Sequence, residues 1–74
     1  MPATLTPIHE VIKAKGLLSV LYKYSIQVVH EDNDTYWIED MKFKRSMTRG
    51  RVVDICKTQA DVIRYLKNLS KLKF

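Results

Sequence analysis

VLYKYSIQVVHEDNDTYWIEDMKFKRSMTRGRVVDIC, residues 20–56 of the 74-residue chain, is the stretch whose hydrophobic pattern decides the fold. Apolar and polar residues alternate over 20–30, 35–45 and 51–56, which is typical of strands with one buried face. Residues 31–34 (EDND) and 46–50 (SMTRG) separate these runs and contain side chains that favour turns. The pattern therefore predicts a three-stranded antiparallel meander.

The alternation also predicts which side chains face the core. In the first strand the apolar face consists of Val20, Tyr22, Tyr24, Ile26 and Val28. In the second strand Trp37, Met41 and Phe43 share a face, and core membership is the favoured interpretation of Trp37. Glu39 interrupts the apolar pattern of that strand and predicts a bulge there. Val53 and Ile55 are expected to point inward from the third strand.

A helix is predicted on each side of the strands. Thr6-Pro7 is typical of a helix start, because Thr can cap a helix and Pro tolerates its first position, and Gly16 is typical of a helix end. An alternative interpretation continues this helix through Leu17, Leu18 and Leu21. Thr58, with Asp61 three residues later, predicts the start of the last helix. The apolar face of that helix is expected to contain Val62, Leu66, Leu69 and Leu72, widened by Ile63 and Tyr65.

These elements predict one small α+β domain over residues 1–74, with residues 1–5 as a loose N-terminal arm. The order is α-β-β-β-α, with two helices covering the three-stranded meander in a two-layer arrangement. This order is similar to that of double-stranded-RNA-binding domains and of the small Alu-domain proteins of the signal recognition particle. The strand-strand-strand-helix part resembles the arm-binding domains of phage tyrosine integrases.

The motifs of a double-stranded-RNA-binding domain do not match this chain. In this chain the segment Lys57-Thr58-Gln59-Ala60 is followed by Asp61, where that family has a lysine. Residues 31–34 stand where the family has a Gly-Pro-His loop. The resemblance is one of topology, and no family or site residue is carried over from it.

The charges are unevenly distributed along the chain. Thirteen Lys and Arg residues against eight Asp and Glu give a net charge of +5. Ten of the bases lie at or after Lys42, whereas residues 30–40 contain five acids and no Lys or Arg. An excess of clustered positive charge favours a polyanionic partner. A solvated surface that simply carries these charges is the competing interpretation.

Enzymatic and metal-binding patterns are almost absent from the sequence. His9, His30 and Cys56 do not have the spacing of a zinc site, and two glycines cannot form a phosphate-cradling loop. We therefore expect no enzyme and no cofactor. Cys56, beside Lys57 at the start of the last helix, is either a reactive thiol or, more often, a small buried apolar residue. The lone cysteine and the absence of a long apolar run favour a cytoplasmic protein.

Two groups of bases are the candidate site. The first is the 42–51 hairpin, with Lys42, Lys44, Arg45, Arg49 and Arg51, and the second is the stripe of Arg64, Lys67 and Lys71 on the last helix. Both can contact phosphates without reading bases. The expected function is a small non-enzymatic nucleic-acid-binding module, for RNA or DNA.

The alternative function is a small regulator or inhibitor, of the phage or accessory type, that docks on an acidic surface of a larger protein. A free strand edge also permits a homodimer. A continuous basic face from the hairpin to the last helix would favour nucleic acid, and an exposed apolar patch would favour protein.

Overall fold

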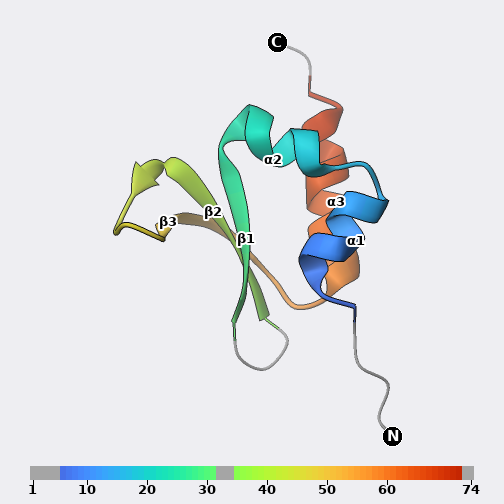
Figure 1. The fold of residues 1–74 in the computed structure, drawn as a ribbon, viewed down its shortest axis with the longest axis horizontal. Coiled ribbons are helices and arrows are strands. Elements are labelled where there is room, and N and C mark those ends of the chain that lie inside the picture. Colours follow the sequence, from blue (N-terminus) through green and yellow to red (C-terminus); the bar gives the residue numbers. More distant parts are fainter. Residues whose placement is uncertain (1–5, 32–34, 73–74) are drawn as a thin grey trace, which may run out of the picture.

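In the part of the chain that the structure describes, three helices cover one face of a three-stranded antiparallel sheet (Figure 1). The computed structural model describes residues 6–31 and 35–72. The element order is α-α-β-β-β-α, so the predicted α+β class and the meander are confirmed, and one helix is added to the predicted order. The expected N-terminal arm (residues 1–5) and most of the acidic turn (residues 32–34) lie outside the described residues.

The first helix, α1 (Ile8–Ala14), begins and ends close to the predicted positions. Pro7 occupies the N-cap position and no side chain caps the helix, so the predicted cap by Thr6 is wrong. Gly16 follows the helix with a φ of +71°. This left-handed conformation is one that glycine adopts without steric cost, and it ends α1.

The main correction concerns residues 18–24, which form a second helix, α2 (Leu18–Tyr24), where the sequence predicted the start of a strand. Leu17, Val20 and Leu21 are buried, whereas Tyr22 is 80% exposed. The buried residues are three and four positions apart, as on one face of a helix, and not two apart, as on one face of a strand. The competing interpretation, one helix running through Gly16, is also wrong, because α2 begins after the Gly16 break.

Ser25 ends α2 in a left-handed conformation, with a φ of +54°, and the chain then enters the sheet. The strands are β1 (Ile26–Glu31), β2 (Thr35–Lys44) and β3 (Gly50–Cys56), in the spatial order β1-β2-β3. Val28 pairs with Ile38, and Tyr36 pairs with Cys56. Opposed residues of an antiparallel pair point to the same face, and these four buried side chains meet the helices.

The other face of the sheet has no helix over it (Figure 1). Ile55 pairs with Trp37 on this face and is 52% exposed, and Val53 is also exposed. The prediction that Val53 and Ile55 point inward is therefore wrong. Trp37 is half-buried outside the core, and Phe43 is exposed. The predicted irregularity at Glu39 is confirmed by a register shift between Ile38 and Glu39.

The last helix, α3 (Gln59–Ser70), packs across the sheet as predicted. Its N-cap is Thr58, whose hydroxyl accepts a hydrogen bond from the Asp61 amide at 3.1 Å. Val62 and Leu66 are fully buried in the core that α3 shares with α1, α2 and the sheet. Leu72 lies after the helix and is exposed, so its predicted place on the apolar face is wrong.

Across residues 6–31 and 35–72, the helices are too short or too polar to cross a lipid bilayer.

Candidate nucleic-acid interface

An open groove of about 540 Å³ runs between α1 and α3. Its apolar floor includes Val11 and Ile63, and four basic side chains line it: Lys15, Arg64, Lys67 and Lys71. No Asp or Glu among residues 6–31 and 35–72 belongs to the lining. These residues, Lys15, Arg64, Lys67 and Lys71, are called the basic groove below.

The spacing of three and four residues places the predicted stripe of α3 along one side of the groove. All three side chains of the stripe are exposed. Arg64 lies 3.5 Å from Asp61, but an exposed pair of this kind holds a guanidinium only weakly. Lys15 was not predicted as a site residue. It follows α1 directly, and only the packing of α1 against α3 brings it to the stripe.

The second predicted group lies on the β2–β3 hairpin, where a dense set of hydrogen bonds orders the turn. The amides of Arg45 and Ser46 donate to the Arg49 carbonyl oxygen at 2.9 and 3.2 Å. The Ser46 hydroxyl accepts from the Arg49 amide at 3.1 Å, and Arg45 Nε donates to the Gly50 carbonyl oxygen at 2.7 Å. These four hydrogen bonds tie the two sides of the turn together.

Glu39 fastens this hairpin to the sheet. Its side chain is fully buried and accepts hydrogen bonds from Arg49, from the Gly50 amide at 3.0 Å and from Gln27 Nε2 at 2.8 Å. The Arg49 hydrogen bonds are the largest cause that lowers the pKa of Glu39, from 4.5 to about 2, although burial opposes the shift. Glu39 therefore remains a carboxylate.

Arg49 differs from the other predicted site residues because its guanidinium forms ion pairs with two carboxylates of the protein itself. It bonds Glu39, pairs with Glu31 at 2.9 Å and lies 5.5 Å from the centre of the Trp37 ring. The hydrogen bonds to Glu39 are the main cause that raises the pKa of Arg49 above its usual value. Arg49 positions the hairpin, and its guanidinium is committed to these internal contacts.

The other hairpin bases are more exposed than Arg49. Lys42 and Lys44 are exposed, and no ion pair holds either of them among the described residues. Arg45 is half-exposed and lies 3.7 Å from Glu39. Arg51 places its guanidinium 4.6 Å from the centre of the Phe43 ring. Four of the five predicted hairpin bases thus retain exposed positive charge.

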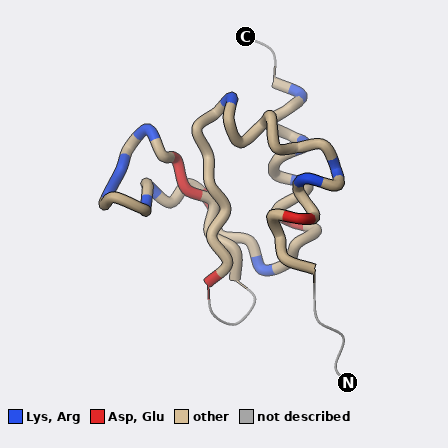
Figure 2. The backbone as a smooth tube through the Cα atoms, viewed as in Figure 1, with Lys and Arg blue, Asp and Glu red and all other residues tan. Residues whose placement is uncertain are grey.

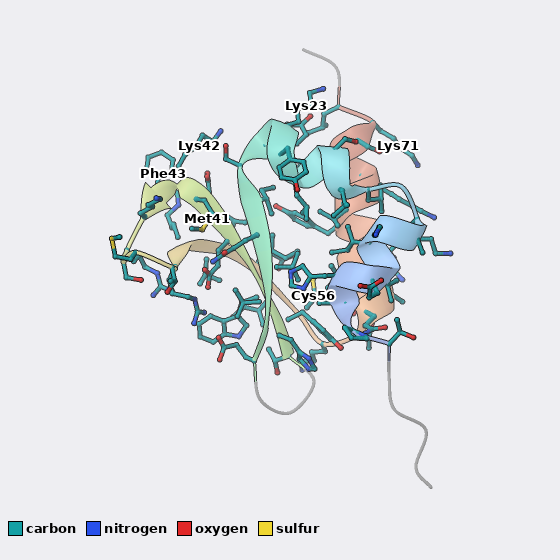
Figure 3. The ribbon with its side chains drawn as sticks, in the orientation of Figure 1. Lys23, Met41, Lys42, Phe43, Cys56 and Lys71 are labelled. Atoms are coloured by element: carbon teal, nitrogen blue, oxygen red, sulfur yellow. The ribbon has the colours of Figure 1, made fainter. Side chains whose placement is uncertain are left out.

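The hairpin and the basic groove lie toward opposite ends of the molecule (Figure 2). Figure 3 shows that Lys42, Lys23 and Lys71 follow one edge of the molecule, from the hairpin across α2 to α3. The molecule spans 16 Å along its shortest axis, which is the viewing direction. Lys42, Lys23 and Lys71 are called the basic edge. Lys23 was missed because its segment was predicted to be a strand.

Cys56 is buried at the end of β3 (Figure 3). Burial is the main cause that raises the pKa of its thiol to about 11, and Asp54 and Asp61 add to the shift. A thiol in this state is a poor nucleophile. The interpretation of Cys56 as a small buried apolar residue is confirmed.

Within the described ranges, no cluster of three or more His, Cys, Asp or Glu side chains could hold a metal ion. Comparisons with protein-family models, with curated proteins and with solved structures gave no match.

Proposed function

We propose that this protein is a non-enzymatic nucleic-acid-binding module whose basic groove contacts the phosphate backbone. One observation carries the proposal: four cationic side chains, from α3 and from the C-caps of α1 and α3, line one open groove, and no carboxylate of the described residues belongs to its lining. Side chains of this kind bind phosphates and release the counterions condensed on them. The proposal places the protein inside the cell, where a lone cysteine stays reduced.

The basic edge extends this surface toward the hairpin, so that a polyanion leaving the groove meets Lys23 and then Lys42. Because Arg49 is committed to Glu39, the proposal assigns the phosphate contacts of the hairpin to Lys42, Lys44, Arg45 and Arg51. These contacts fix the position of the nucleic acid and carry no base sequence information.

The test measures how affinity depends on salt, with fluorescence anisotropy of a labelled 20-bp duplex and of labelled (dT)20. Replacing Lys15 and Lys67 with Gln removes two groove charges. The log–log salt slope should then fall by about 1.8 on the duplex or about 1.4 on the single strand, at about 0.9 or 0.7 per phosphate contact. The matched control replaces Lys13 and Lys57, which are exposed and lie outside the groove lining.

The control variant loses the same net charge, so it separates a local contact from the general electrostatic attraction of the protein. An equal fall of the slope in both variants would refute the assignment to the groove. If the native protein binds neither probe at low salt, the nucleic-acid proposal is wrong, and the regulator that docks on an acidic protein surface takes its place.

A further inference from the structure

Two aromatic side chains lie exposed beside the lysines of the basic edge. Tyr22 is 80% exposed and precedes Lys23 on α2. Phe43 is 55% exposed and stands between Lys42 and Lys44 on β2 (Figure 3). Exposed aromatic rings that alternate with cations are typical of surfaces on which the bases of a single strand stack.

The fold excludes both rings from the core. The buried side of α2 is occupied by Val20 and Leu21, which turns Tyr22 to solvent. The pairing of β2 with β3 shifts register between Asp40 and Lys44, and Phe43 lies within this irregular stretch. The Arg51 guanidinium then lies over the Phe43 ring at 4.6 Å, which holds the ring in place and leaves more than half of the side chain exposed.

The surface that presents Phe43 is ordered in advance. The Glu39 contacts and the turn hydrogen bonds hold the hairpin, and Gln27 Nε2 donates to the Thr48 carbonyl oxygen at 2.8 Å. A Cβ at Gly50 would collide with the Asp40 carbonyl, so the close approach of the two strands requires glycine there. A preformed platform loses little conformational entropy when a ligand binds.

We propose that the nucleic acid bound by this protein is single-stranded, with bases stacked on Tyr22 and Phe43 while the basic edge and the basic groove hold the phosphates. This proposal rests on the proposed function and specifies its ligand. A duplex keeps its bases stacked inside, so neither ring could reach a base face without unstacking the helix. A single strand offers a base face at every nucleotide.

The experiment compares anisotropy titrations with labelled (dT)20 and with a labelled 20-bp duplex. The native protein should bind (dT)20 more tightly. Tyr22→Ala and Phe43→Ala should each weaken (dT)20 binding about fivefold to 150-fold, the equivalent of one stacked base. Neither variant should change the salt slope, because neither removes a charge. Phe43→Tyr should restore most of the affinity.

Met47→Ala is the matched control, because Met47 is an exposed apolar residue of the same hairpin, 91% exposed, without a ring. Its affinity for (dT)20 should equal that of the native protein. Circular dichroism of each variant checks that the fold is retained.

Three results would overturn the inference while leaving the proposed function intact. These are equal affinity for duplex and single strand, unchanged (dT)20 binding by both alanine variants, and an equal loss with Met47→Ala. If the native protein binds neither probe, both proposals fail together. Loss of (dT)20 binding in the groove variant alone would support the groove and contradict a role of the rings.

Discussion

Replacing Glu39 with Gln is the most direct test of how the hairpin is held. The glutamine keeps the shape of the side chain and the oxygen that accepts from the Gly50 amide and from Gln27, but its amide hydrogens oppose the donors of Arg49 at the other position. Removing one partner of a buried ion pair costs about 3–5 kcal/mol. We expect a value of about 3 kcal/mol, because Arg49 is partly exposed and can turn its guanidinium to water.

That loss is large for a protein of this size. At about 0.05–0.15 kcal/mol per residue, 74 residues correspond to a free energy of unfolding of about 4–11 kcal/mol. Urea unfolding followed by circular dichroism and by Trp37 fluorescence measures the change. Hydrogen exchange of the Arg45 and Ser46 amides, which bond the Arg49 carbonyl, shows whether the hairpin opens locally.

Glu31→Gln is the matched control. Glu31 also pairs with Arg49, at 2.9 Å, but its side chain is about one-third exposed. An ion pair open to solvent contributes about 0–1 kcal/mol, so this variant should remain close to the native protein. If Glu39→Gln unfolds within about 0.5 kcal/mol of the native protein and leaves hairpin exchange unchanged, Glu39 does not fasten the hairpin.

The same residue predicts a pH dependence. The folded protein lowers the pKa of Glu39 from 4.5 to about 2, so the unfolded chain binds a proton first as the pH falls. The stabilisation by Glu39 is therefore complete above pH 4.5 and is lost progressively as the pH falls toward 2. The Glu39→Gln variant should lose less stability over this range than the native protein. Parallel pH profiles for the two proteins would contradict the assignment.

Three further predictions concern the core, a helix cap and the thiol. Leu66→Ala should lower the free energy of unfolding by about 2–5 kcal/mol in urea titrations, because Leu66 is fully buried; an unchanged midpoint would mean that α3 does not pack on the sheet. Thr58→Ala should cost about 1 kcal/mol by the same assay through loss of the α3 cap, and no cost would argue against that hydrogen bond. Cys56 should react with a thiol reagent at pH 8 only after urea is added; rapid reaction of the native protein would show that it is accessible.

Residues 18–24 illustrate where a hydrophobic pattern loses its predictive power. Val20, Tyr22 and Tyr24 have the two-residue spacing of one strand face, yet Leu17, Val20 and Leu21 also fit a helix. A short apolar segment can fit both the two-residue period of a strand and the roughly 3.6-residue period of a helix. Which of the two forms depends on what the segment packs against. Here Tyr24 donates a hydrogen bond from its hydroxyl to the Leu69 carbonyl oxygen of α3 at 3.1 Å, a contact 45 residues away in sequence.

The candidate site shows the same limit. The spacing of Arg64, Lys67 and Lys71 was sufficient to place them on one face of α3, because helical geometry relates residues three and four apart. Lys15 and Lys23 could not be added from sequence, since only helix packing brings them to that surface. Nor could Arg49 be separated from the other hairpin bases, because its partner Glu39 is ten residues away and shares its environment only after β2 and β3 pair.

Local signals alone determined the meander, the cap of α3 by Thr58 and the break at Gly16, because turn chemistry, capping and backbone freedom act over a few residues. Tertiary structure decided which sheet face is buried. Trp37 and Ile55 are as apolar as Tyr36 and Ile38, but the helices lie over the face that Tyr36 and Ile38 share. Strand alternation defines two faces and does not state which one a helix will cover, since that depends on contacts between segments far apart in the chain.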